Sequence, residues 1–161
     1  MTPGSCTPPS DPGRDEVILR VREHVDAHWC GGECERFARS LGFEGNDLWE
    51  LSIAVRELAT NVVKFAGEGV VTLRRLEEPR VGIEIVAEDD GPGIEDVAAA
   101  RQDGFSEGRM LVDCDRRVPR RGLGTGLGAV ERMMNDMVIE NRPEGGLRIV
   151  ARRWLAPTRV G

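Results

Sequence analysis

The sequence predicts an α/β fold of the two-layer α+β type, in which one mixed sheet is covered by helices on one face. Two observations support this expectation: a long stretch with helical periodicity in the first half of the chain, and β-branched segments arranged like hairpins. Because helices and hairpin-like strands are interspersed, they are expected to pack as two layers around one core. A length of 161 residues fits one domain.

The first half of the chain contains a tail, a strand and two helices. Residues 1–15 are rich in Pro, Gly and Ser, which favours disorder. Residues 17–21 have the composition of a strand, and the helical region after them ends near Leu41-Gly42. A second helix is predicted over 47–66, with Asn46 or Asp47 as its N-cap.

The second half alternates between strands and helices. Strands are predicted over 69–75 and 81–87, with a turn around Glu78-Pro79 between them. A short helix is expected after Ile94. The remaining elements are a helix over 129–137 and strands near 137–141 and 147–154. The domain is therefore expected over residues 16–155, with a C-terminal tail at 156–161.

Composition excludes several classes of protein. The formal net charge of −6 disfavours a nucleic-acid binder, which is usually basic. The chain has no apolar run of membrane-spanning length and no secretory apolar core, so we expect a cytoplasmic protein without a membrane partner. The four cysteines do not resemble a disulfide scaffold in a chain of this length, and reduced thiols are the simpler expectation.

The predicted second helix carries a polar stripe. Glu57, Asn61 and Lys64 stand at i, i+4 and i+7 and share one helical face. An amide oxygen suits Mg²⁺, a carboxylate can accept a proton from a hydroxyl, and a lysine can approach phosphate oxygens. Taken alone, the stripe fits an ordinary solvated face better than a site.

A sharp turn follows the predicted strand at 81–87. Asp89 stands near its end, where a carboxylate can accept a hydrogen bond from an exocyclic amine such as that of adenine. Gly91 and Gly93, with Pro92 between them, allow the backbone to approach a planar ligand. By itself the segment also fits an acidic turn.

A second glycine-rich segment precedes the predicted helix at 129–137. Glycines at 122, 124, 126 and 128 expose successive N–H groups and a helix N-terminus, which is the outline of an anion cradle. No clear strand leads into this segment, which disfavours a dinucleotide-binding fingerprint. The segment also lacks the Lys-Ser/Thr that ends a P-loop.

These segments together resemble the GHKL superfamily of ATP-binding domains, which has the Bergerat fold of the histidine-kinase-like ATPases. Residues 57–66 resemble its N box, Asp89 to Ile94 its first glycine box, and Gly122 to Leu127 its second. Within the superfamily, the chain is most similar to the anti-sigma regulatory serine kinases of bacterial partner-switching pathways, and among them to the RsbT-type switch kinases. Residues 101–106 resemble their lid, and the resemblance covers residues 16–155.

The resemblance implies a role for each site residue. Asp89 would recognise adenine, Asn61 would hold Mg²⁺, and Glu57 would act as the catalytic base toward a serine hydroxyl. Gly91 and Gly93 would shape the adenine wall. The residues expected around the phosphates are Gly122, Gly124, Thr125, Gly126 and Leu127, with Lys64 nearby.

The implied activity is transfer of the γ-phosphoryl group of Mg-ATP to a serine of a STAS-domain antagonist or scaffold protein. Two alternatives stay open: an anti-sigma factor that sequesters a sigma factor, and a non-catalytic ATP-gated module that activates a phosphatase of the PP2C type. The oligomeric state is also open, a homodimer included.

Two features depart from the family pattern. After Gly145-Gly146 the family usually has a threonine that supports the adenine-binding aspartate, whereas this chain has Leu147. The link between the glycine boxes is also longer and rich in arginine. We expect Leu147 to weaken adenine recognition and the longer link to change the lid or a partner surface.

A separate cluster raises the question of zinc. Potential ligands stand close together at His24, His28, Cys30 and Cys34. Their spacing is not that of a usual zinc finger, and Gly31-Gly32 would interrupt a rigid helical presentation of the ligands. We favour the alternative, in which both cysteines pack inward as small apolar groups.

Overall fold

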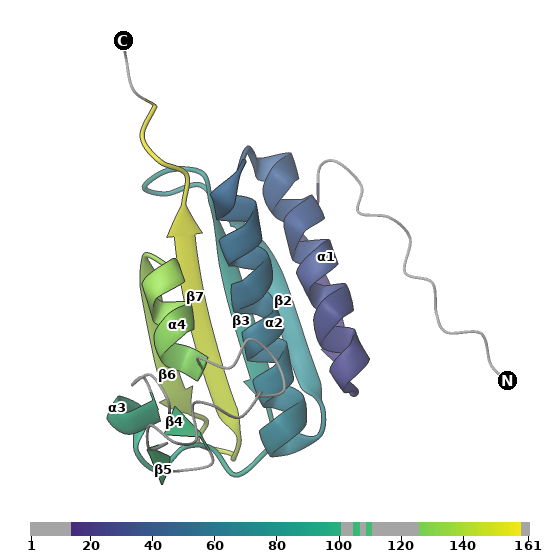
Figure 1. The fold of residues 1–161 in the computed structure, drawn as a ribbon, viewed down its shortest axis with the longest axis vertical. Helices are drawn as coiled ribbons and strands as arrows, with labels where there is room; N and C mark the ends of the chain where they lie inside the picture. Colours follow the sequence, from purple (N-terminus) through teal and green to yellow (C-terminus); the bar gives the residue numbers. More distant parts are fainter. Residues whose placement is uncertain (1–13, 101–104, 107–108, 111–125, 159–161) are drawn as a thin grey trace, which may run out of the picture.

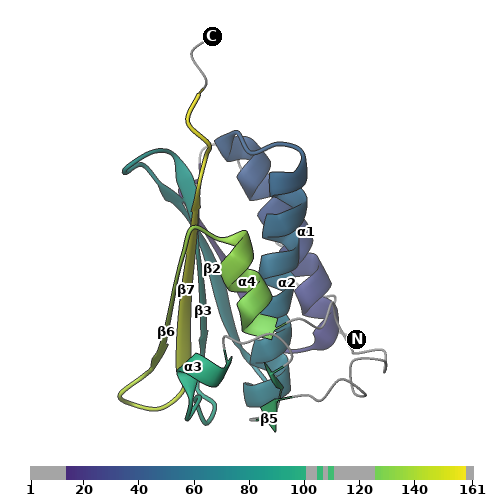
Figure 2. The same cartoon turned by 60° about the vertical axis from the view of Figure 1, so that its left-hand side comes forward.

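The computed structural model describes residues 14–100, 105–106, 109–110 and 126–158. In this part of the chain, a five-stranded sheet with the order β1-β2-β3-β7-β6 forms one layer, and helices α1, α2 and α4 cover one of its faces (Figures 1 and 2). The strands of the sheet are β1 (Glu16–Val21), β2 (Gly69–Leu76), β3 (Gly82–Asp89), β6 (Asp136–Asn141) and β7 (Leu147–Trp154). The other elements are α1 (His24–Leu41), α2 (Asn46–Ala66), α3 (Val97–Ala100), β4 (Phe105–Ser106), β5 (Arg109–Met110) and α4 (Gly126–Met133).

The two-layer fold predicted from the sequence is confirmed, with one correction to the sheet. Every pairing in the five-stranded sheet is antiparallel, whereas a mixed sheet was expected. The connection between β1 and β2 explains the difference. When one helix connects two neighbouring strands, the second strand runs parallel to the first. Here two antiparallel helices, α1 and α2, connect β1 to β2, so the chain reverses direction once more and β2 runs antiparallel to β1.

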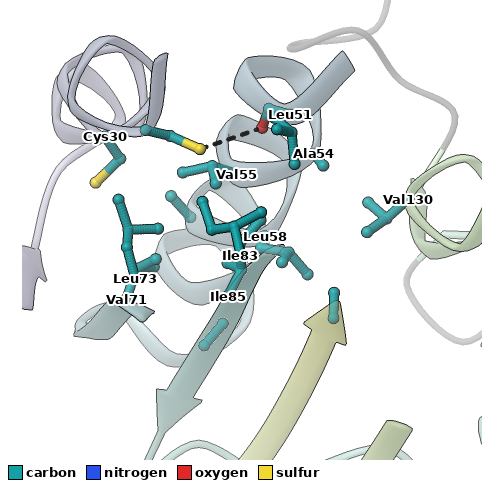
Figure 3. Packing of buried hydrophobic residues seen from close by; sticks show 14 of the residues in the cluster. Cys30, Leu51, Ala54, Val55, Leu58, Val71, Leu73, Ile83, Ile85 and Val130 are labelled. Carbon is teal, nitrogen blue, oxygen red and sulfur yellow. Dashed lines mark hydrogen bonds between the residues drawn. The ribbon is translucent and has the colours of Figure 1, made fainter. Parts of the chain in front are cut away.

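The core lies between the sheet and the helices. Alternate residues of β1 are buried, as expected for a strand with one covered face. Leu51, Val55 and Leu58 of α2 point toward Leu73 and Ile85 of the sheet (Figure 3). Burying each such side chain contributes roughly 1.5–3 kcal/mol. This packing fixes the orientation of α2 relative to β3, and therefore of the polar residues along the helix.

The helix boundaries correct two expectations. Gly45, not Asn46 or Asp47, is the N-cap of α2. Helix α1 runs through Gly31 to Leu41, in agreement with the predicted end of this helical region, and Gly31 lies where α1 meets α2: a Cβ there would lie 2.4 Å from Arg56 Nε. Helix α4 ends at Met133 rather than at residue 137, since the Asn135 N–H donates to the Arg152 carbonyl and the chain enters β6.

The uncovered face of the sheet carries a row of alternating charges, one residue from each strand. Glu16, Arg74, Glu84, Arg152 and Asp136 lie opposite one another in register. Arg152 donates to both Glu84 and Asp136 at 2.7 Å. The row makes this part of the face polar, and next to it on the same face lies a second row that includes Ile18, Val86, Val150 and Val138.

No helix in the described ranges is long and apolar enough to cross a membrane.

Candidate functional site

Three segments named by the sequence analysis converge at one end of the sheet, called here the glycine end. Asp89 at the end of β3 lies opposite Gly69, which follows the C-terminus of α2. A Cβ on Gly91 would lie 2.8 Å from the Cβ of Ala66, so the loop after β3 touches the end of α2. Helix α4 begins at the same end of the molecule (Figures 1 and 2). The glycine end is thus built from α2, the loop after β3, and the N-terminus of α4.

The Asp89 carboxylate is held from one side. Asp89 continues the row of Ile85 and Ala87 that faces the helices, and it is only 8% exposed. Its Oδ1 accepts hydrogen bonds from the N–H groups of Gly91 at 2.9 Å and Leu147 at 3.3 Å. The described part of the chain supplies no hydrogen bond to Oδ2. A buried carboxylate with one open oxygen is suited to accept a hydrogen bond from a ligand.

The threonine position of the family is occupied by a residue that acts through its backbone. Leu147 donates its N–H to the Asp89 carboxylate, while its side chain packs against the hydrophobic core. The hydrogen bond that this backbone N–H donates does not require a threonine side chain. The support of Asp89 is therefore present without a hydroxyl.

The stripe on α2 runs from the interior to the surface. Glu57 is 7% exposed, Asn61 is partly buried, and Lys64 is exposed. The Lys64 ammonium lies 5.2 Å from the centre of the Phe65 ring, within the range of a cation–π contact. The exposure of the stripe therefore increases along α2 toward the glycine end, from the buried carboxylate of Glu57 through the amide of Asn61 to the exposed ammonium of Lys64.

The second glycine segment is only partly described. Gly126 begins α4 with φ of +69°, which a glycine adopts readily. Leu127 is 6% exposed and belongs to the core, so its backbone rather than its side chain is available at the N-terminus of α4. The expectations for Gly122, Gly124 and Thr125, and for residues 101–104 of the lid, lie outside the described residues.

Three residues at the site were not selected from the sequence as functional: Asn141, Arg142 and Gly146. The Asn141 amide bonds both backbone groups of Ile94, at 2.8 and 2.7 Å. The guanidinium of Arg142 donates to the Asp89 carbonyl at 3.0 Å. No sequence motif marks these contacts, because they join segments about 50 residues apart. The one local signal at these positions is the pair Gly145-Gly146, which indicates a tight turn between β6 and β7.

The potential zinc ligands do not converge. Cys30 (Figure 3) and Cys34 are buried in the core, whereas His24 and His28 are exposed. The Sγ of Cys34 lies 3.7 Å from the Leu51 carbonyl oxygen. Burial, with a contribution from Asp26, raises the pKa of the Cys30 thiol to about 12, and burial likewise raises that of Cys34. Among the described residues, no group of three or more His, Cys, Asp or Glu side chains is placed to hold a metal.

Comparison with known proteins agrees with this geometry. Residues 27–152 match the family model of the histidine kinase-like ATPase domain. The chain belongs to this family, as its N box and glycine boxes predicted. It is an ATP-binding GHKL domain, and ATP is the nucleotide that such a domain uses.

Individual relatives are more specific. The chain is 34% identical over 142 residues to the serine/threonine-protein kinase RsbT of Bacillus subtilis, a match that covers 88% of this chain and 98% of that protein. It is 26% identical over 127 residues to the anti-sigma F factor of Caldanaerobacter subterraneus, covering 76% of this chain and 81% of that protein. A solved structure, the histidine kinase domain of the E. coli osmosensor EnvZ, aligns with 26% identity and a TM-score of 0.40 over 71% of this chain and 69% of that one.

Proposed function

We propose that this protein is a Mg-ATP-dependent serine/threonine kinase of a bacterial partner-switching pathway, which phosphorylates a serine of a STAS-domain antagonist or scaffold protein. The observation that carries the proposal is the buried Asp89 carboxylate, whose Oδ2 accepts no hydrogen bond from the described residues, near the C-terminus of the helix that bears Glu57 and Asn61. The match to the RsbT kinase of Bacillus subtilis over 98% of that protein supports the choice of activity.

The residues around Asp89 fit the base of ATP. Oδ2 would accept the exocyclic N–H of adenine, while Oδ1 keeps its two backbone donors. A guanine presents an oxygen where adenine presents its amine, and that oxygen would face the carboxylate without a proton between them. The site is therefore expected to prefer adenine. Gly91, placed against Ala66 with no space for a side chain, brings the backbone close to the ligand.

The polar residues of α2 would perform the remaining chemistry. ATP supplies the phosphoryl group to be transferred. Asn61 would hold Mg²⁺ through its amide oxygen, and Lys64 would place a positive charge near the phosphates. Glu57, buried within the same helical face, would orient the substrate serine and accept its proton. Catalysis in such a site rests on positioning and charge stabilisation.

The proposal is tested by phosphoryl transfer. Purified protein is incubated with Mg²⁺, γ-labelled ATP and each STAS-domain protein of the same genome in turn, and label on that protein is measured. Glu57→Gln should reduce the rate by about 100-fold to 10,000-fold, the usual contribution of a general base, while ATP affinity changes little. Glu35→Gln is the matched control, because Glu35 is a partly exposed glutamate of α1 that is paired with Arg39 and lies outside the proposed site.

The possible results separate the candidates. Transfer at the normal rate by Glu57→Gln would exclude Glu57 as the base. Binding of ATP without any labelled partner, together with activation of a PP2C-type phosphatase, would replace the kinase with an ATP-gated module. The similarity to an anti-sigma F factor favours a second candidate, a kinase that also sequesters a sigma factor. Co-purification of a sigma subunit in the presence of ATP would support that candidate.

A further inference from the structure

We propose that Asn141 and Arg142 are positioning residues for nucleotide recognition, which act from the β6–β7 hairpin on the loop between Asp89 and Ile94. This inference rests on the proposed function, because it concerns the same site. It adds the elements that set the position of the Asp89 carboxylate, although neither residue belongs to a motif of the nucleotide site.

At the far end of the loop, the Asn141 side chain makes the hydrogen bonds that a neighbouring strand would otherwise make to the backbone. Its Oδ1 accepts the Ile94 N–H at 2.8 Å, and its Nδ2 donates to the Ile94 carbonyl at 2.7 Å. Ile94 lies beyond the end of β3, where the pairing of the strand has stopped. A planar amide carries a donor and an acceptor together and can satisfy both backbone groups at once. This pair of bonds fixes where the loop turns away from the sheet.

Arg142 holds the near end of the loop. Its Nη1 donates to the Asp89 carbonyl at 3.0 Å and to Asp90 Oδ1 at 2.8 Å, and its Nη2 donates to Glu144 at 2.9 Å. The bond to the Asp89 carbonyl restrains the peptide whose side chain is the proposed adenine acceptor. Because the Leu147 N–H bonds the carboxylate of the same residue, the hairpin contacts Asp89 at both backbone and side chain.

The loop and the hairpin are also closely packed at two glycines. A Cβ on Gly146 would lie 1.9 Å from the Asp89 carbonyl oxygen, and a Cβ on Gly93 would lie 2.3 Å from Asn141 Oδ1. Such distances leave no room for a side chain at either position. Asn141 and Leu147 are paired across β6 and β7, so the position of the turn between them depends on the position of the sheet. A small displacement of the hairpin would therefore move the carboxylate relative to the base.

The test compares Asn141→Ala with Asn135→Ala. Asn135 stands before the other end of β6, and its Oδ1 accepts the Trp154 N–H at 2.9 Å. Each variant loses an asparagine side chain that is hydrogen-bonded to the backbone. Of the two asparagines, Asn141 is the one that contacts the loop. Affinities for ATP and GTP are measured by calorimetry, and thermal midpoints are measured for both variants. We expect Asn141→Ala to weaken ATP binding by about tenfold and to lower the ratio of ATP to GTP affinity, whereas Asn135→Ala leaves this ratio unchanged.

Hydrogen exchange gives a readout that needs no nucleotide. In Asn141→Ala the amides of Gly91, Gly93 and Ile94 should exchange at least about tenfold faster, while in Asn135→Ala they keep the wild-type rate. An unchanged ATP-to-GTP ratio in Asn141→Ala, or unchanged exchange at these three amides, would overturn the inference. Failure of the wild type to bind ATP would instead refute the proposed function, and the exchange experiment would still decide whether the hairpin holds the loop.

Discussion

Arg153 and Asp89, two largely buried charged residues at opposite ends of the sheet, differ in how completely their charges are paired. Away from the glycine end, the guanidinium of Arg153 is 16% exposed and donates to Asp47, Glu50 and the Met133 carbonyl. At the glycine end, the Asp89 carboxylate is 8% exposed, and no arginine or lysine of the described residues pairs with it. Removing one partner of a buried ion pair destabilises the fold because it leaves an uncompensated charge, whereas a carboxylate that keeps an open oxygen is available to a ligand. The comparison separates a structural end from the proposed binding end.

The largest effect is expected from Gly146→Ala at the binding end. The new Cβ would collide with the Asp89 carbonyl, and the φ of +95° at this position already disfavours a side chain. Strain and overpacking together cost about 3 kcal/mol, which would displace the loop and weaken ATP binding by about 100-fold. Calorimetric titration with ATP measures this loss.

The neighbouring glycine provides the control. Gly145 has φ of +104°, but a Cβ there would meet nothing within 4 Å. Gly145→Ala therefore introduces backbone strain without a collision, and its ATP affinity should stay within about threefold of the wild type, a change below 1 kcal/mol. Equal losses in the two variants would mean that turn strain, rather than contact with Asp89, controls binding.

Arg153→Met tests the structural end. Methionine retains the apolar stem but leaves Asp47 and Glu50 without their cation, so the free energy of unfolding should fall by about 2 kcal/mol. This figure is discounted for solvent, because both carboxylates are about a third exposed. Urea denaturation measures the loss. ATP affinity should be unchanged, and a parallel loss of affinity would show that the two ends are coupled.

The smallest effect is expected from Leu147→Thr, which restores the residue usual in the family. Since the Leu147 N–H already donates to Asp89, a hydroxyl adds little, and ATP affinity should change by less than about threefold. Calorimetric titration with ATP measures the affinity of Leu147→Thr relative to the wild type. A gain of tenfold or more would support the original expectation that Leu147 weakens adenine recognition.

Sequence patterns predict this fold where the signal is local. Helical periodicity located α2, β-branched composition located β2, β3 and β7, and the ordered motifs identified the family. The predicted end of α1 near Leu41 is confirmed, whereas the N-cap of α2 and the limits of α4 were predicted wrongly. Both errors concern a helix boundary, which depends on contacts elsewhere in the chain. The end of α4, for example, is set where the Asn135 N–H donates to the Arg152 carbonyl.

The sequence by itself determined the class of this protein, because residue type and spacing along the chain are sufficient to mark an amphipathic helix, a strand and a glycine turn. The tertiary structure alone decided how the site is supported. The antiparallel sheet brings Asn141 and Arg142 to a loop about 50 residues earlier in the chain, and it lets a backbone N–H of Leu147 support Asp89 in place of a hydroxyl. Such contacts depend on strand register and backbone direction, which no local pattern encodes.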